Sequence, residues 1–268
     1  MTRHFVLFTL LFFIGCAVLP SRYVSLDDQK SSDFEGILRE IDGKRVIFIG
    51  EIHGSPDIHL LQLEIIKHLH KSGRPVMVAM EAFPAGKQEI FDRWIAGDLS
   101  EYDFQKVYRQ TWAVPFDYYE GILLYAREQK ISLIAINADN ALIANVSKNG
   151  LRVATEDFLS QVKFSDCSTD PLYKEIVGRT YHASEFPFLC DGQRLRDSIM
   201  AYNIANAITV SNKTVVVLVG GTHAIRPAVP RMLQNHVSVD YAILLPATIT
   251  EVLRRAPDRN IADYIWYE

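Results

Sequence analysis

The stretch that decides the fold has the sequence RVIFIGEIH, at residues 45–53. It opens with a short, continuous apolar run that ends at Gly50, a pattern typical of a buried strand in a parallel sheet. Further runs of this kind lie at residues 75–80, 132–136, 214–219 and 241–245. Helical stretches separate the runs, so the sequence predicts an α/β fold with right-handed crossovers between the strands.

Two helical stretches carry an apolar stripe, at residues 57–70 and 193–208. The segment between the third and fourth strands is much longer than a crossover helix requires. Together with residues 97–129, we expect it to form a helical cap over one edge of the sheet. The predicted fold is a mostly parallel sheet of four to five strands, flanked by helices, with this cap inserted mainly between the third and fourth strands.

The composition is that of an ordinary globular protein. The chain has 268 residues, of which 49% are hydrophobic and 22% charged, and its net charge is -4. Lys and Arg are scattered, so we expect no nucleic-acid partner. The chain shows no internal repeat and no Pro/Gly/Ser-rich seam. We therefore predict a single domain over residues 34–268.

The N-terminus has the pattern of an export signal. Arg3 and His4 precede an apolar run at residues 5–14, which is too short to span a bilayer. The sequence FIGC at residues 13–16 resembles a bacterial lipobox, with Phe13 where Leu is usual. The prediction is a signal peptide over residues 1–15, lipidation of Cys16 and a tether over residues 16–33. No acidic residue follows Cys16, which favours anchoring in the outer membrane of the cell envelope.

Two further cysteines, Cys167 and Cys190, lie in the body of the chain. Export would place them where disulfides persist, so a bridge between them is one interpretation. Two buried free thiols are the other, and the sequence leaves both open.

Polar side chains follow four of the predicted strands. They occur in Gly50-Glu51-Ile52-His53, Glu81, Asn137-Ala138-Asp139 and Gly220-Gly221-Thr222-His223. Ligands of open parallel sheets bind beyond the carboxyl ends of the strands, so we expect a functional site there, built from Glu51, His53, Glu81 and His223. Asp139 is better interpreted as the N-cap of a following helix.

The two Gly-x-x-His turns favour acid–base or metal chemistry. The N-terminus of a following helix would disfavour the imidazolium form of such a histidine. A neutral imidazole can ligate a metal or act as a general base. Glu51, His53 and His223 are thus candidate ligands of a divalent metal ion.

At these residues the chain resembles the ChaN-like haem-binding lipoproteins of the Tiki superfamily, which is related to the erythromycin esterases. The resemblance extends from about residue 46 to residue 245, and Gly54 departs from it, since an acidic residue often follows the first histidine. The matching residues are Gly50-Glu51-Ile52-His53 with His59 and Gln62, Glu81-Ala82-Phe83, Gln193, Arg196, Asp197, Met200 and Ala201, and Gly220-Gly221-Thr222-His223.

The resemblance implies haem binding and a contribution to iron acquisition, with a homodimer and other iron-uptake components as partners. Haem iron needs an axial ligand such as Tyr or His, and the ring needs an apolar slot. The candidates for the ligand are Tyr181, His182 and Tyr202, beside Phe186 and Phe188.

The resemblance also leaves a hydrolase open, either metal-dependent or using His53 as a base. Its catalytic residues would be Glu51, His53, Glu81, Arg196, Asp197 and His223. No Gly-x-Ser-x-Gly sequence is present, so water would have to be the nucleophile. A third possibility is an envelope lipoprotein that keeps the fold, has lost both activities and serves as a binding partner.

Overall fold

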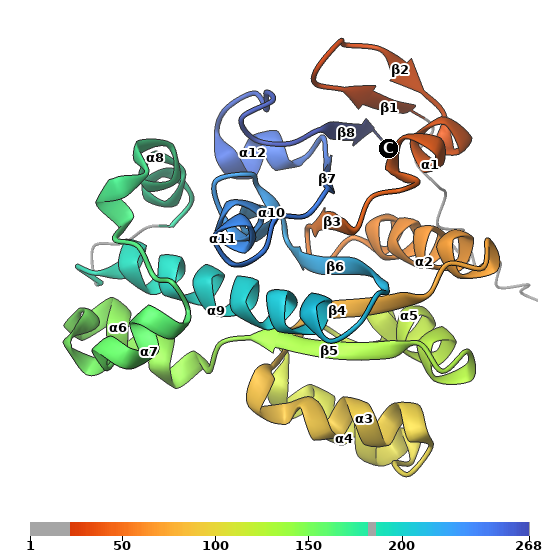
Figure 1. Ribbon diagram of the computed structural model, residues 1–268, viewed down its shortest axis with the longest axis horizontal. Coiled ribbons are helices and arrows are strands. Elements are labelled where there is room, and N and C mark those ends of the chain that lie inside the picture. The colour runs from red at the N-terminus through yellow and green to blue at the C-terminus, as the bar shows by residue number, and fades with distance from the viewer. Residues whose placement is uncertain (1–21, 182–185, 268) are drawn as a thin grey trace, which may run out of the picture.

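The computed structural model describes residues 22–181 and 186–267, and over these ranges the strands form one eight-stranded sheet (Figure 1). The strand order is β2-β1-β8-β7-β3-β6-β4-β5. The strands are β1 (Arg22–Ser25), β2 (Ser31–Ser32), β3 (Val46–Glu51), β4 (Val76–Pro84), β5 (Ser132–Asn137), β6 (Thr214–Gly220), β7 (Tyr241–Pro246) and β8 (Tyr264–Tyr267).

The predicted α/β class is confirmed, and the five predicted runs are strands β3 to β7. β3 pairs in parallel with β6 and β7, and β4 pairs in parallel with β5 and β6. The predicted number of strands was wrong. β8 extends the sheet in parallel to β7, and β1 then pairs antiparallel with both β8 and β2, so the sheet is mixed. These added strands have four residues or fewer, too short to give a recognisable run.

The predicted tether over residues 16–33 also needs correction where the structure describes it. β1 and β2 lie in this stretch, and the side chain of Tyr23 is fully buried. The chain therefore belongs to the sheet from Arg22 onward. The predicted signal peptide and Cys16 lie outside the described residues.

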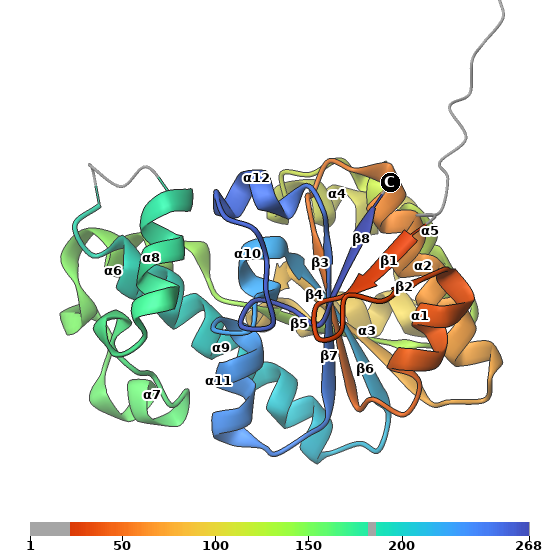
Figure 2. The same cartoon turned by 90° about the horizontal axis from the view of Figure 1, so that it is seen from above.

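Helices cover both faces of the sheet, as Figure 2 shows. Alternate residues of each buried strand face opposite sides, so Ile47 and Ile49 pack in one core, and Val46 and Phe48 in the other. The first face is covered by α1 (Phe34–Ile41), α2 (Pro56–Lys71), α3 (Gln88–Ala96), α4 (Glu101–Thr111) and α5 (Phe116–Glu128). The other side carries α6 (Asn140–Asn149), α7 (Glu156–Gln161), α8 (Pro171–Thr180), α9 (Leu189–Thr209), α10 (Gly221–Ala224), α11 (Val229–His236) and α12 (Ile249–Leu253).

The predicted single cap is two separate structures. Residues 97–129 contain α4 and α5, whose buried Phe104 and Tyr119 pack in the first core. The insert between β5 and β6 forms α6, α7 and α8 on the opposite side, where α6 and α7 share a small core with α9 (Figure 2). The length of these segments predicted helices, but it does not say which face of the sheet each one covers. Among the helices of residues 22–181 and 186–267, none is long and apolar enough to cross a membrane.

Candidate functional site

The site begins where β3, β6 and β4 end side by side. Glu51, the last residue of β3, is paired with Gly220, the last residue of β6. The backbone N–H of Gly220 donates a hydrogen bond to Oε2 of Glu81, at 2.7 Å. A Cβ atom at residue 220 would lie only 3.3 Å from Cε1 and Nε2 of His53. Glycine is therefore what allows His53 and Glu81 to approach the same backbone.

Glu51 and His53 form the first carboxylate–histidine pair. Nδ1 of His53 lies 2.8 Å from Oε1 of Glu51. Gln62 of α2 donates to Oε2 of Glu51 at 2.6 Å, and the hydroxyl of Tyr119 of α5 donates to Oε1. The Glu51 side chain is 2% exposed, whereas that of His53 is 37% exposed. The carboxylate is thus fixed from three sides, and the imidazole it orients reaches the surface.

His59 and Trp112 hold the turn that carries His53. The His59 ring contacts Oε1 of Gln62 through Nδ1 at 2.9 Å and the backbone oxygen of His53 through Nε2 at 3.0 Å. Trp112 packs edge-on against the His53 ring, with 5.0 Å between ring centroids. A cavity of about 190 Å³ opens on this turn, and it is lined by Glu51, Ile52, His53, Thr180, Gly220, Gly221, Thr222, Ile249 and Val252.

Asp197 and His223 form a second pair. Nδ1 of His223, in α10, bonds Oδ1 of Asp197, in α9. The hydroxyl of Tyr173, in α8, donates to Oδ2 of Asp197 at 2.7 Å. On its other side, Nε2 of His223 lies 3.6 Å from Oε1 of Glu81. The His223 side chain is 9% exposed, so this pair is enclosed by protein.

The carboxylates determine the protonation of both histidines. Burial alone would lower the pKa of His53, but the hydrogen bond to Glu51 and the charges of Glu81 and Glu51 outweigh it, so this pKa is raised. Burial likewise opposes the charged form of His223, yet Asp197 and Glu81 raise its pKa. Burial would raise the pKa of Glu51, but its hydrogen bond from His53 and the neighbouring histidines lower it.

These shifts run opposite to the effect of the helix N-terminus that was expected from the sequence. The helix N-terminus considered from the sequence is a weak partial charge. The carboxylate neighbours of His53 and His223 are full charges within hydrogen-bond or ion-pair distance. The neighbouring carboxylates therefore raise the pKa of both histidines above its ordinary value, in spite of burial.

The predicted divalent-metal site does not fit the structure. Within the described ranges, no group of three or more His, Cys, Asp or Glu side chains is placed to hold a metal ion. The proposed ligands Glu51 and His53 bond each other, and His223 bonds Asp197 instead. Spacing along the sequence brought the right residues to one edge but did not reveal that they pair with one another.

Arg196 joins the site through the end of β5. Its guanidinium donates to Oδ1 of Asn137 at 2.9 Å and to Oδ1 of Asn140 at 3.0 Å. The amide of Asn137 donates in turn to the backbone oxygen of Glu81, at 2.9 Å. Asp139 caps α6 by accepting from the backbone N–H groups of residues 141 and 142, as predicted.

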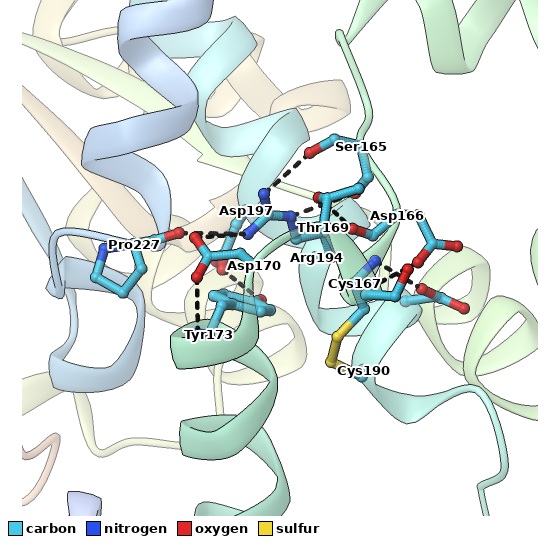
Figure 3. Close-up of a disulfide and its surroundings, with 12 residues drawn as sticks. Ser165, Asp166, Cys167, Thr169, Asp170, Tyr173, Cys190, Arg194, Asp197 and Pro227 are labelled. Carbon is cyan, nitrogen blue, oxygen red and sulfur yellow. Dashed lines mark hydrogen bonds and ion pairs between the residues drawn. A yellow bond between two sulfur atoms is a disulfide. The ribbon is translucent and has the colours of Figure 1, made fainter.

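Cys167 and Cys190 are joined by a disulfide, with 5.9 Å between their Cα atoms (Figure 3). The bond ties the segment before α8 to the start of α9. Cys190, Arg194 and Asp197 follow one another at helical spacing on α9, so one stripe of this helix holds the segment that carries Tyr173.

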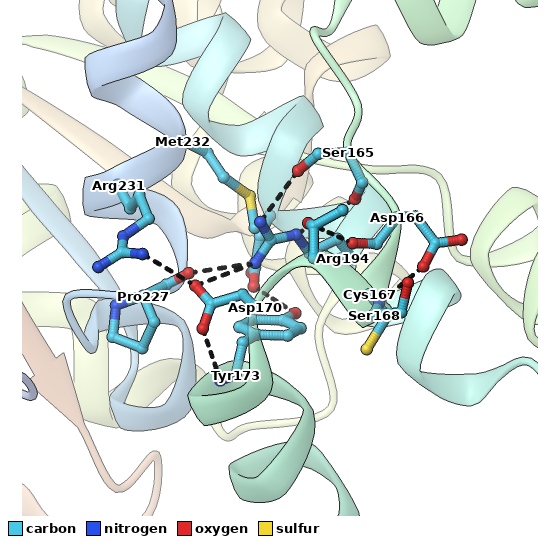
Figure 4. Close-up of polar contacts among 12 residues, drawn as sticks. Ser165, Asp166, Cys167, Ser168, Asp170, Tyr173, Arg194, Pro227, Arg231 and Met232 are labelled. Atoms are coloured by element: carbon cyan, nitrogen blue, oxygen red, sulfur yellow. Dashed lines mark hydrogen bonds and ion pairs between the residues drawn. The ribbon is translucent and has the colours of Figure 1, made fainter.

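Arg194 organises the polar contacts beside the disulfide (Figure 4). Its guanidinium donates to Oγ of Ser165 at 2.9 Å and lies 3.8 Å from Oδ2 of Asp170. Asp170 also pairs with Arg231 at 3.2 Å and caps α8 by accepting from the backbone N–H of Tyr173. The cluster therefore fixes the N-terminal end of α8, from which Tyr173 reaches Asp197.

The predicted haem ligands do not lie together. The hydroxyl of Tyr181 is 3.3 Å from Oγ1 of Thr222, beside the second Gly-x-x-His turn. The hydroxyl of Tyr202 accepts from Gln161, and its ring packs near His236, away from that turn. His182 lies outside the described residues. Tyr181 is thus the candidate that borders the site.

Sequence reasoning missed two tyrosines that complete the carboxylate–histidine pairs. Tyr119 and Tyr173 lie on helices that are remote in sequence from the strand ends they reach. No spacing pattern links them to Glu51 or Asp197. Their hydroxyl partners depend on how α5 and α8 dock against the sheet.

Comparison with known proteins gives the relatives of this chain. A family model described as haem-binding uptake, Tiki superfamily, ChaN matches residues 37–233. The structure of ChaN of Campylobacter jejuni with cofacially bound haem is similar, at a TM-score of 0.67 and 17% identity, over 91% of this chain and 95% of that chain. A mutant of the erythromycin esterase EreC in its open conformation gives a TM-score of 0.50 and 12% identity, over 84% and 76% of the two chains.

A chloroplastic protein of Arabidopsis thaliana, RETICULATA-RELATED 5, is 23% identical over 266 residues. The alignment covers 88% of this chain and 35% of the plant protein, so the chain spans only a minor part of that relative. At these identities the structural likenesses show the fold. The family model, however, matches most of the chain, and the protein therefore belongs to the haem-binding uptake family ChaN of the Tiki superfamily.

Proposed function

We propose that this protein binds haem and contributes to iron acquisition at the cell envelope. The observation that carries the proposal is the match of the haem-binding uptake family over residues 37–233. The carboxyl edge of the sheet is the part of the molecule where a ligand would meet polar and apolar groups together.

Tyr181 is the residue we propose as axial ligand of the iron, with His182 and Tyr202 as the alternatives. The Tyr181 hydroxyl lies beside Thr222, at the edge of the site. A few residues farther along the chain, Phe186 and Phe188 are 38% and 42% exposed. Such rings offer an apolar surface to a porphyrin, and a phenol oxygen is an established type of haem ligand.

The size of the cavity favours a ligand that is covered by a second protein surface. Its volume of about 190 Å³ is below the range usual for a pocket that encloses an organic ligand, roughly 300 to 1,000 Å³. A haem would lie across the opening with one face uncovered. We therefore propose that a second copy of the chain covers the haem in a homodimer, with other iron-uptake components as further partners.

A haemin titration of the full chain in detergent tests the proposal. We expect a shifted Soret band that saturates at about one haem per chain, together with dimer formation in sedimentation. Tyr181→Phe should change the iron spectrum, and Tyr102→Phe, at a tyrosine that is 73% exposed, serves as the control. A featureless titration would reject haem as the ligand.

Anchoring is a separate proposal. We propose that residues 1–15 are a signal peptide and that Cys16 is lipidated, which would place the protein on the outer membrane. Cys16→Ser should abolish labelling by radioactive fatty acid, and labelled mutant protein would reject the anchor.

The second candidate function is hydrolysis with water as the nucleophile. The specific observation in its favour is the Glu51–His53 pair, whose partly exposed imidazole borders the cavity. Glu51 orients the ring, so Nε2 of His53 is free of that contact and able to exchange a proton with water. Turnover of an ester or peptide by the wild type, and its loss in His53→Ala, would establish this function.

A further inference from the structure

The positively charged guanidinium of Arg196 is held by neutral partners and has no carboxylate partner among the described residues. Its two bonded partners, Asn137 and Asn140, are neutral amides. Within residues 22–181 and 186–267, no carboxylate forms an ion pair with it. A guanidinium has five N–H donors and is the side chain best suited to bind a carboxylate through parallel hydrogen bonds. The asparagines take two of these donors, and no carboxylate of the described residues takes the others.

The arrangement around Arg196 is rigid. Asn137 is 4% exposed, and three contacts fix its amide: Oδ1 accepts from Arg196 and from the backbone N–H of Ala138, and Nδ2 donates to the backbone oxygen of Glu81. Asn140 begins α6, so the second partner comes from a different element. The guanidinium is therefore oriented before any ligand arrives, which reduces the entropy lost on binding.

Arg196 belongs to the same edge of the sheet as the two histidines. The next residue of α9, Asp197, bonds His223. Burial raises the pKa of Tyr181 to about 12, and the charge of Arg196 is among the influences that oppose this rise. Asn137 ends β5, which is three strand spacings from β3, or about 14 Å along the edge. A ligand that reaches from the cavity at His53 to the β5 end is thus an extended one.

We propose that Arg196 is an anion-binding residue that receives a propionate carboxylate of the bound haem. This inference rests on the proposed function and deepens it. Haem carries both propionates on one edge of the macrocycle, and a macrocycle lying along the carboxyl edge of the sheet could bring that edge to Arg196. The two asparagines act as positioning residues, since they orient the guanidinium and do not supply charge.

Esterified haem provides the test. The full chain in detergent is titrated with haemin and with its dimethyl ester, in which neither propionate is charged. We expect the wild type to bind the diacid roughly ten- to a hundredfold more tightly, the effect of one charge-assisted hydrogen bond. Arg196→Gln should lose this preference while binding the diester as the wild type does.

Arg109→Gln is the matched control, because Arg109 also contacts an amide, Oε1 of Gln105 at 3.2 Å, but lies on α4 across the sheet. It should keep the full preference. Equal affinity of the wild type for both porphyrins, or an unchanged preference in Arg196→Gln, would overturn the assignment, and so would equal loss of both ligands in that variant. Failure of the wild type to bind either porphyrin would instead overturn the proposed function, and this inference with it.

Discussion

The two carboxylate–histidine pairs at the carboxyl edge are built alike and exposed differently. In each, a nearly inaccessible carboxylate accepts a hydrogen bond from a tyrosine hydroxyl and orients the Nδ1 atom of an imidazole. The His53 side chain is 37% exposed and borders the cavity. The His223 side chain is 9% exposed, and its second nitrogen faces Glu81.

This difference separates two roles that the sequence presents as equivalent. Both histidines stand in Gly-x-x-His turns, at the ends of neighbouring strands. The one that meets solvent can exchange protons with water or contact a ligand. The other directs both nitrogens at carboxylates, so its main effect is to hold Glu81 and Asp197 in place. Identical local sequence patterns can thus yield one histidine that meets solvent and one that is enclosed between carboxylates.

The largest expected effect comes from truncating the two histidines. His223→Ala leaves Asp197 and Glu81 buried without a cationic neighbour, and we expect it to lower the free energy of unfolding by about 3–5 kcal/mol. His53→Ala leaves Glu51 with its bonds from Tyr119 and Gln62, so a loss of about 1 kcal/mol is expected. Urea unfolding of both variants measures the difference.

Equal losses in these two variants would contradict the division of roles. His70→Ala serves as the control, because His70 lies on α2, bonds the hydroxyl of Tyr125 and is away from the site. Its loss should not exceed that of His53→Ala.

A smaller effect is expected from the tyrosines, and here the two pairs should behave alike. Tyr119→Phe and Tyr173→Phe each remove one hydroxyl that donates to a buried carboxylate. A hydrogen bond to a charged group contributes about 1.5–3 kcal/mol, so both variants should lose this amount in urea unfolding. If one variant were as stable as the wild type, its tyrosine would not stabilise its carboxylate. The claim that the two pairs are built alike would then be wrong.

The sequence was sufficient for the central part of the fold. Continuous apolar runs predicted β3 to β7, because strands buried on both faces must be apolar at every position. The same reasoning could not find β1, β2 and β8, which are short strands added beyond β7 at one side of the sheet. Nor could periodicity assign α4 and α5 to one face and α6 to α8 to the other.

The candidate site was predicted in position but not in connectivity. Parallel strands bring their carboxyl ends together, and this placed Glu51, His53, Glu81 and His223 at one edge. Which carboxylate pairs with which imidazole depends on the docking of α9 and on the tyrosines of α5 and α8. Among the described residues, the predicted metal ligands are divided between two pairs, and no three such side chains converge on one point.

The smallest expected effect is the dependence of stability on pH. The pKa values of His53 and His223 are raised in the folded state by their carboxylate neighbours. The stability they provide is therefore fully present below the ordinary histidine pKa of about 6.5, and is lost as the pH rises through the raised values. For Glu51, whose pKa is lowered, the contribution is present above its ordinary pKa of about 4.3 and is lost on acidification.

Urea unfolding from about pH 5 to about pH 9 should accordingly show stability falling on the alkaline side, and each histidine-to-alanine variant should reduce that slope. An unchanged slope in both variants would contradict the raised pKa values. High salt should distinguish the contributions of the two carboxylate–histidine pairs, because screening at about 1 M acts mainly on charges that meet solvent. At high salt, the contribution of His53 to the pH dependence of stability should become smaller, because His53 is partly exposed. The contribution of His223, which is enclosed by protein, should not change.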